Sequence, residues 1–328
     1  MNPHEQHRWL MPSLIALTAA LTLLSVVVGK VMLTWDVIAQ QDSVTRIILL
    51  ELRIPRALLG CVVGIALGLA GAAMQAYLRN ALAEPGTLGV SYTAALGAVL
   101  SIFFGIAGMH AWALPFAGVA GGVIGMIVLF ALSGMTASVL TLVLAGVLLG
   151  TLAFAGISLV LSLSPNPWAA GEIVRWMLGA LTDRGLDDLL IATPLTLIGG
   201  ALILSCRQAM DALTLGELGA RSLGIDLHRV QWRLCAGVGL VVGASVAVTG
   251  IIGFVGLVVP HLLRPLVGSR PSALLIPSAL GGAVIVLAGD IVVRLLPGGS
   301  EVQLGVVMSL VGAPFFFALL YSLRRRLT

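Results

Sequence analysis

Charged side chains are scarce in this chain, and their scarcity excludes an ordinary soluble protein. Asp, Glu, Lys and Arg make up 10% of the 328 residues, whereas 59% of the residues are hydrophobic. Residues 85–171 contain none of the four charged types. At about 20 residues per crossing, that stretch alone holds roughly three membrane spans. The composition therefore predicts an all-α membrane protein that forms a single transmembrane domain over residues 1–328.

Lysine is almost absent, and with it any recognisable site for a nucleotide. Of the 18 basic residues 17 are Arg, and the one Lys, Lys30, lies in the sequence VVVGKVM. A P-loop needs a Lys within G-x-x-x-x-G-K-[ST], so this chain has none. We therefore expect no catalytic residues and no enzyme activity of its own, with ATP and Mg²⁺ bound by a partner chain. The Arg residues are scattered between apolar blocks, which argues against nucleic-acid binding.

Cysteine is also rare, and its placement indicates neither a disulfide framework nor a zinc site. Cys61, Cys206 and Cys235 are isolated and lie in or beside apolar stretches, where a thiol behaves as a small hydrophobic group. We expect no metal and no other cofactor to be bound by this chain.

Long apolar blocks predict ten membrane spans. Eight blocks are read directly, and residues 234–263 are read as two spans because Gly250, Gly253 and Pro260 interrupt them. The first block, residues 10–29, is interpreted as an uncleaved membrane span and not as a signal peptide, since no small-residue cleavage site follows it. An even count places both termini on one side, and the tail Arg324–Arg326 marks that side as cytoplasmic. The eight blocks read directly are residues 10–29, 57–78, 87–108, 112–132, 139–161, 189–206, 272–289 and 302–323.

Glycine is abundant, with 40 residues, and it recurs at helical spacing. Small residues at every third or fourth position let helix backbones approach closely inside a membrane, as in Gly64, Gly68 and Gly71 of the second span and Gly239 and Gly243 of the seventh. The second and seventh spans also share a Val-Gly pair followed seven residues later by Gly. This pattern hints at an inverted-repeat-like arrangement, although chance in glycine-rich helices explains it almost as well.

The longest polar stretch on the predicted cytoplasmic side contains residues 212–228. It reads as two short amphipathic helices, with an i, i+4 pair of Glu217 and Arg221, a helix end at Gly224 and a cap at Asp226. Such a pair of helices suits the groove of a partner protein. An ordinary loop helix that rests on the bilayer surface gives the same pattern, so both interpretations stay open at this point.

Arg53, Arg56 and Arg294 lie beside span ends on the predicted outer side, with Glu51, Asp290 and Glu301 nearby. Arginine at a membrane boundary commonly anchors a helix, and the alternative is a docking surface for an acidic partner. His261 and Arg264 lie one turn apart near the inner boundary, where we expect a structural or gating role. Because ionisable residues are nearly absent from span centres, an ion-coupled secondary transporter is the weaker alternative.

Seven segments in order resemble the permease family of iron-chelate and cobalamin ABC importers, the type II importers. The resemblance runs from the second span to the C-terminus, and it departs from the family where prolines are replaced at Ala81, Ile251 and Gln303. The matching segments are LRIPR (52–56), GAAMQAYLRNALAEPGTLGVS (71–91), LAGVLLG (144–150), LGELGARSLGI (215–225), GIIGFVGLVVPHLLR (250–264), GDIVVR (289–294) and EVQLGVVMSLVGAPFF (301–316).

The resemblance implies a type II importer permease fold with ten spans in the bacterial inner membrane. It implies a second copy of the chain, two ATP-binding cassette subunits and a periplasmic substrate-binding protein as partners. The expected cargo is an iron chelate, either siderophore or haem, or cobalamin. The segments 71–91 and 244–264 look somewhat closer to the cobalamin permease than to siderophore permeases.

Three sets of residues receive roles from the resemblance. Arg53, Arg56 and Arg294 are expected to receive Glu residues of the binding protein. Thr141, Thr151, Ser158 and Ser309 on the fifth and tenth spans are expected to line the pathway, with helix packing as the alternative for each hydroxyl. The residues expected to contact the ATPase are Leu215, Gly216, Glu217, Ala220, Arg221, Leu223 and Gly224.

Overall fold

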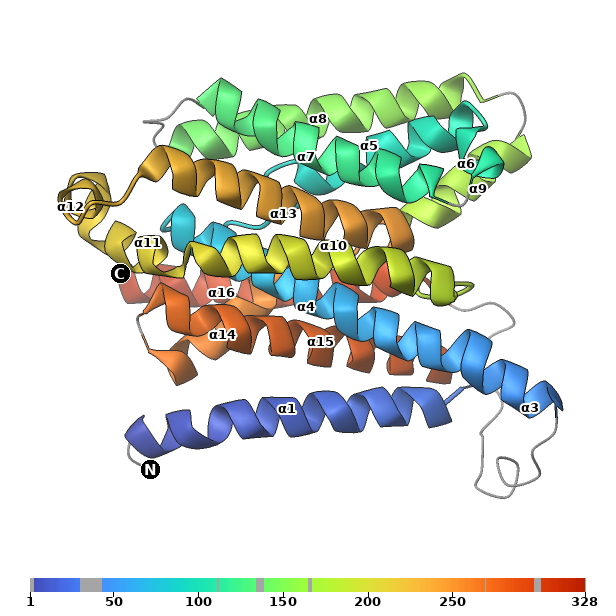
Figure 1. The fold of residues 1–328 in the computed structure, drawn as a ribbon, viewed down its shortest axis with the longest axis horizontal. Helices are drawn as coiled ribbons and strands as arrows, with labels where there is room; N and C mark the ends of the chain where they lie inside the picture. The colour runs from blue at the N-terminus through green and yellow to red at the C-terminus, as the bar shows by residue number, and fades with distance from the viewer. Residues whose placement is uncertain are drawn as a thin grey trace.

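A computed structural model describes residues 3–29, 43–110, 112–133, 139–164, 167–268, 270–297 and 302–327. These residues form helices joined by short turns, and no strand occurs among them (Figure 1). The elements are α1 (Pro3–Val27), α3 (Ser43–Ile47), the π-helix η1 (Ile48–Arg53), α4 (Ile54–Tyr77), α5 (Val90–Phe103), α6 (Ile106–Met109), α7 (Ala113–Ser133), α8 (Val139–Ser162), α9 (Pro167–Met177), α10 (Leu186–Ser205), α11 (Arg207–Ala212), the 3₁₀ helix η2 (Leu213–Leu215), α12 (Gly216–Ser222), α13 (Leu227–Thr249), α14 (Val255–Val267), α15 (Pro271–Leu295) and α16 (Leu304–Leu327).

Seven helices of the described chain are long and apolar enough to cross a membrane alone. They belong to α1, α4 with its N-terminal extension, α7, α8, α10, α13 and α15, and three shorter apolar helices are α5, α14 and α16 up to Leu319. Each of the ten apolar segments expected from sequence corresponds to one of these helices. The expected break in residues 234–263 is confirmed, because α13 ends at Thr249 and α14 begins at Val255. Ten crossings remain a prediction.

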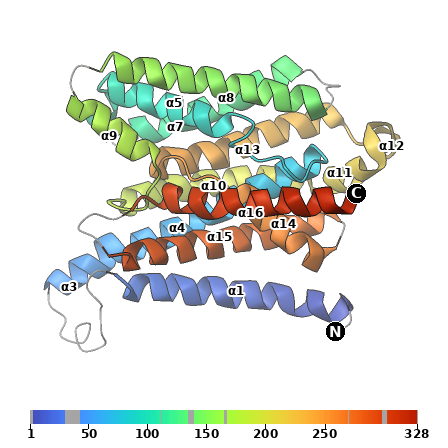
Figure 2. The ribbon, with the colours of Figure 1, turned by 180° about the vertical axis from the view of Figure 1, so that it is seen from behind.

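The bundle has two distinct ends. The start of α1 and the end of α16 lie at the end that carries α11 and α12, which we call the α12 end (Figures 1 and 2). The opposite end carries α3, α6 and α9, and we call it the far end. The helix α9 was not expected from the sequence, because its 11 residues are too short and too polar to register as a span. Its Trp168 is 71% exposed, which suits a helix lying at a membrane surface.

Two short helices begin inside the bundle at left-handed residues. Gly89 (φ 78°) precedes α5, and Phe254 (φ 67°) precedes α14. A Cβ on Gly89 would lie 2.6 Å from the Gly150 backbone nitrogen in α8, so only glycine fits there. The Phe254 side chain packs against Gly312 of α16, where an added Cβ would overlap the Phe254 ring. Each half of the chain therefore has a long helix, a returning loop and a short helix seated on the last span of that half.

Glycines let the central helices pack backbone to backbone. A Cβ on Gly64 of α4 would lie 2.5 Å from Ala283 Cα in α15, and one on Gly68 would overlap the Ser278 carbonyl. In the other half, a Cβ on Gly243 of α13 would lie 2.7 Å from Val119 Cα in α7. These contacts confirm the role expected for the spaced glycines.

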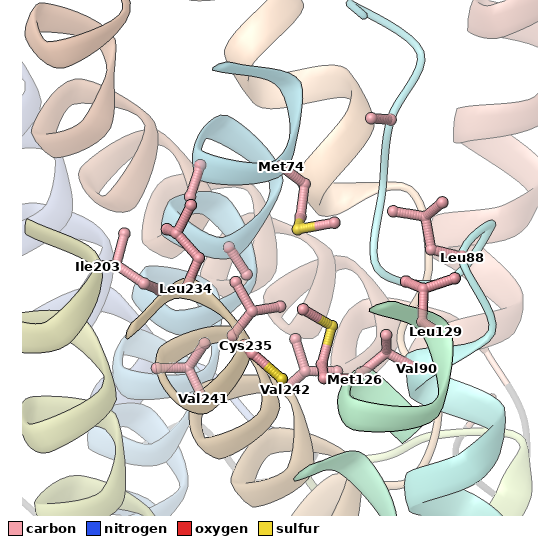
Figure 3. Packing of buried hydrophobic residues seen from close by; sticks show 14 of the residues in the cluster. Met74, Leu88, Val90, Met126, Leu129, Ile203, Leu234, Cys235, Val241 and Val242 are labelled. Carbon is pink, nitrogen blue, oxygen red and sulfur yellow. The ribbon is translucent and has the colours of Figure 1, made fainter. Parts of the chain in front are cut away.

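Between these helices the core is filled by large apolar side chains. Figure 3 shows Met74 of α4, Met126 and Leu129 of α7, and Leu234 of α13 converging in one cluster, all of them nearly or fully buried. Leu88, from the loop that returns after α4, enters the same cluster. The packing of Leu88 against these side chains helps to hold the returning loop inside the bundle.

Candidate coupling and docking surfaces

The segment 212–228 forms the two short helical pieces expected from the sequence. Gly216 (φ 85°) separates η2 from α12, and Gly224 (φ 79°) ends α12. Asp226 caps α13, because its Oδ1 accepts a hydrogen bond from the Arg229 backbone nitrogen at 3.1 Å. That bond lowers the pKa of the Asp226 carboxyl, since it stabilises the charged form. Gly224 at the end of α12 and Asp226 at the start of α13 thus have the roles expected from the sequence.

One side of this segment is buried and the other is strongly apolar and exposed. Leu213 and Ala220 pack with Ala212 against Tyr77 and seat α12 on the bundle. Ala220 is therefore a seating residue in this chain, not an exposed contact. The opposite side projects three leucines, Leu215, Leu218 and Leu223, which are 69%, 83% and 62% exposed. We call these three side chains the leucine knob.

The expected pair of Glu217 and Arg221 is not formed. Among the ion pairs of the described residues none joins these two side chains, although they stand one turn apart on α12. A helix of only seven residues on the surface gives such a pair little reason to close, since exposed i, i+4 pairs contribute only about 0.3–0.5 kcal/mol. Both charges are thus left for other contacts beside the leucine knob.

A link from this segment to α15 was missed by sequence reasoning. The Asp211 carboxylate accepts hydrogen bonds from the Ser272 backbone nitrogen (2.9 Å) and from the Ser272 hydroxyl (2.6 Å). Ser272 lies in the first turn of α15, where backbone N–H groups lack helical partners. The two residues are 61 positions apart, so no local pattern pointed to this contact. It joins α11 firmly to the start of α15.

The three arginines expected to act together lie close to one another at the far end: Arg53 ends η1, Arg56 lies in the first turn of α4, and Arg294 lies in the last turn of α15. Arg56 Nη2 donates to Asp290 Oδ1 at 2.7 Å, and Arg294 Nε donates to Asp290 Oδ2 at 2.9 Å. Arg53 stands close enough to Arg56 and Arg294 to be repelled by both. Asp290 is fully buried. Among the described residues, Arg56 and Arg294 thus share the Asp290 carboxylate, and Arg53 stands beside them. Glu51 is exposed, and Glu301 lies outside the described residues.

The same arginines close the C-terminal end of α1. Arg294 Nη1 donates to the Ser25 carbonyl at 2.6 Å, and Arg53 Nη1 donates to the Val27 carbonyl at 2.7 Å. The last carbonyls of a helix lack internal donors and carry partial negative charge, so guanidinium groups stabilise them. Arg53 and Arg294 are only 9% and 5% exposed. We call Arg53, Arg56, Arg294 and Asp290 the arginine cluster.

The hydroxyls expected to line a pathway are directed to their own helices. Thr151 and Ser158 of α8 donate to the Val147 and Phe154 carbonyls, and Ser309 of α16 donates to Gly305 in the same way. Thr141 is exposed on the same helix as Thr151. The outward side of α8 is otherwise apolar, with Leu148 and Leu152 being 67% and 71% exposed. The assignment of these residues to a pathway stays a prediction. The hydroxyl hydrogens of Thr151, Ser158 and Ser309 are already donated to carbonyls of their own helices.

Within the part of the chain that the structure describes, no three His, Cys, Asp or Glu side chains come together in a way that could hold an ion. That the chain binds no metal and no other cofactor stays a prediction.

The described chain is thus a bundle of helices, seven of them long and apolar enough to cross a membrane, with the exposed leucine knob at one end and the arginine cluster at the other. Residues 17–322 match the FecCD transport family. The chain is 38% identical to the vitamin B12 import system permease protein BtuC of Vibrio cholerae, covering 97% of this chain and 96% of that one. It is 36% identical to the ABC transporter permease protein YvrB of Bacillus subtilis, covering 88% and 82%.

A solved structure of a metal-chelate type ABC transporter in an inward-facing conformation has the same fold. The TM-score is 0.86 at 31% identity, over 96% of this chain and 99% of the other. The chain therefore belongs to the FecCD transport family of ABC transporter permeases.

Proposed function

We propose that this chain carries an iron chelate or cobalamin across the bacterial inner membrane, driven by ATP hydrolysis in a partner subunit. The observation that supports this proposal is that two surfaces suited to partners lie at opposite ends of the bundle and are joined by one helix. The leucine knob lies at the α12 end, the arginine cluster lies at the far end, and α15 runs between them. From Ser272 to Asp290 this helix spans about 27 Å at 1.5 Å per residue.

The leucine knob is the proposed contact with an ATP-binding cassette subunit. Three exposed leucines on a short, glycine-bounded segment are costly in water unless a partner covers them. Leu215, Leu218 and Leu223 would enter an apolar groove, with Glu217 and Arg221 at its rim and with Gly216 and Gly224 allowing the turns. ATP and Mg²⁺ would reside on that subunit.

The arginine cluster is the proposed contact with a periplasmic substrate-binding protein. Three guanidinium groups gathered at one end of the bundle suit the charge of an acidic partner. Because Arg53 and Arg294 are largely buried against α1, most of this attraction acts through the field of the cluster before direct contact.

A second copy of the chain is the proposed neighbour of α8 and α16. The outward leucines of α8 and the exposed Phe317 and Leu310 of α16 leave broad apolar faces on the isolated chain. Figure 2 shows α16 on the side of the bundle away from α10 and α13. A pathway between two copies would then be bordered by Thr141, Thr151, Ser158 and Ser309.

Ten crossings with cytoplasmic termini and an inverted repeat complete the proposal. Close glycine packing pairs α4 with α15 and α13 with α7, which is the correspondence expected if each half repeats the other in reverse. The returning loops before α5 and α14 correspond in the same way. The start of α1 and the end of α16 share the α12 end, which suits an even number of crossings.

Cobalamin is the cargo favoured by the B12 permease relatives, whereas the metal-chelate neighbour keeps an iron chelate in contention. Identifying the binding protein that docks here, and the ligand it holds, decides between them. A secondary transporter is the competing class, and it differs in energy source: uptake would follow an ion gradient without ATP.

Mutation of the leucine knob tests the ATPase contact. Leu218→Ala should weaken binding of the ATPase subunit by about 1 kcal/mol or more, roughly fivefold, because Leu218 is the most exposed member. Leu197→Ala on α10 is the matched control, since Leu197 is 68% exposed but lies away from the α12 end. Equal affinity of both variants in a pull-down titration with the ATPase would refute the assignment.

A further inference from the structure

A cavity of about 690 Å³ opens at the α12 end beside the coupling segment. Its walls come from the end of α4, from η2, from α14, from the turn before α15 and from Leu319 of α16. Four of its lining residues are cationic or titratable bases, namely Arg79, His261, Arg264 and Arg270. The remaining walls are largely apolar. Neither the coupling nor the docking assignment uses this cavity.

The positive charge of the cavity is uncompensated. No carboxylate lines it, and none of its three arginines forms an ion pair with a described residue. The nearby Asp211 is occupied by its two hydrogen bonds to Ser272. An anion that enters this hollow would therefore meet guanidinium groups that no described carboxylate pairs with.

Arg264 is held in position for such an anion by an unusual chain of contacts. Pro260 of α14 has no N–H, so the Gly256 carbonyl one turn earlier lacks its helical donor. Gln75 of α4 supplies that donor through Nε2 at 3.2 Å, and its Oε1 accepts a hydrogen bond from Arg264 Nη2 at 2.8 Å. The Gln75 side chain is therefore fixed from both ends. The other guanidinium nitrogens of Arg264 remain available to the cavity.

Two other side chains complete the wall. Arg79 is held at the end of α4 in a left-handed conformation (φ 48°), and its Nη1 lies near Gly216 at the start of α12. His261 Nδ1 is buried without a hydrogen-bond partner. An anion in the cavity would thus touch both the short helix α14 and the coupling segment.

We infer that this cavity binds a phosphate-bearing anion. Guanidinium groups match phosphate oxygens in charge and in fork geometry, and basic hollows between membrane helices near the cytoplasmic surface suit anionic headgroups. The apolar wall formed by Leu274 and Leu319 suits the first carbons of an acyl chain. The phosphate can come from a lipid or from solution, and the two sources are separable.

The test measures heat stability of the full-length chain, purified with its ATPase subunit, during titration with three additives. Phosphatidylglycerol is the anionic lipid, phosphatidylcholine is the zwitterionic lipid, and inorganic phosphate is the free anion, all at matched ionic strength. The variant is the double substitution Arg79→Gln with Arg270→Gln, since both side chains are exposed and unpaired and their loss leaves the Gln75 contact intact. Arg207→Gln is the matched control, an exposed arginine of the same end outside the cavity.

Phosphatidylglycerol is expected to raise the melting temperature of the wild type and of Arg207→Gln at the same concentration. The double variant should need roughly 30-fold more, at about fivefold per arginine. An equal response to inorganic phosphate identifies a free anion as sufficient, and a response to phosphatidylglycerol alone identifies a lipid. An unchanged response of the double variant, or no response of the wild type to either anion, overturns the inference. So does loss of the ATPase subunit from the double variant with its lipid response intact, because the arginines would then serve a partner carboxylate.

Discussion

At the scale of single residues, Asp290 holds the arginine cluster together. Its two oxygens accept from Arg56 and from Arg294, and it is fully buried. Without this carboxylate, the Arg56 and Arg294 guanidinium groups would each lose an ion pair in a largely buried site. Removing one partner of a buried charge network is far more costly than losing a surface pair.

Asp290→Asn should therefore lower the free energy of unfolding by about 3–5 kcal/mol. The measurement is denaturant unfolding of the purified chain in mixed micelles. Glu51→Gln is the control, because Glu51 is exposed and lies two residues before Arg53 in η1. This substitution should change stability little. A loss for Asp290→Asn no larger than that of the control would show that the cluster does not depend on this carboxylate.

Gly68 sits at the closest approach of α4 and α15, where an added Cβ would overlap the Ser278 carbonyl. Gly68→Ala should cost about 1–3 kcal/mol, because the backbones must move apart. Gly253→Ala is the matched control, since a Cβ there meets nothing within 4 Å and its φ is not left-handed. Thermal unfolding of both variants checks this, and a Gly68→Ala protein as stable as Gly253→Ala would contradict the packing.

At the scale of elements, α15 connects the segment that carries the leucine knob with the arginine cluster. Its first turn is joined to α11 through Asp211 and Ser272, and its last turns carry Asp290 and Arg294. The helix α15 is continuous from Pro271 to Leu295, with Pro277 inside it, and we propose that a displacement of its first turn is passed along it. Movement of the coupling segment would therefore reach the arginine cluster.

Asp211→Ala should weaken this transmission. We expect stimulation of ATPase activity by the binding protein to fall several-fold, while affinity for the ATPase subunit changes little, because Asp211 lies outside the leucine knob. The readout is ATP hydrolysis in liposomes with and without the binding protein. Asp187→Ala, an exposed acidic residue at the far end of α10, is the control. Full stimulation of the Asp211→Ala protein would show that the contact with Ser272 carries no coupling.

At the scale of the whole molecule, hydrophobic blocks and turn residues were enough to place the apolar helices. The break at Gly250 to Phe254, the turn at Gly224 and the cap at Asp226 all depend on local chemistry, so they could be read from neighbouring residues. The grouping of the three arginines also followed from their positions at span ends and from the family resemblance.

Contacts between distant segments could not be read in this way. The link of Asp211 to Ser272 depends on tertiary packing, and so does the burial of Arg53 and Arg294 against α1. Pro260 gave one unused signal, since a proline inside a helix frees a carbonyl that some donor must satisfy, and Gln75 is that donor. The prediction that Glu217 and Arg221 form a pair was wrong, because i, i+4 spacing shows only that two side chains can meet.

Uptake by the reconstituted complex tests the central claim most directly. Liposomes would contain the permease chain, its ATPase subunit and ATP inside, with the loaded binding protein outside, and labelled cobalamin or ferric chelate would be counted in the lumen. The account predicts uptake that requires ATP, is blocked by vanadate and disappears when the ATPase subunit is omitted. Undiminished uptake by the permease chain without that subunit would contradict it.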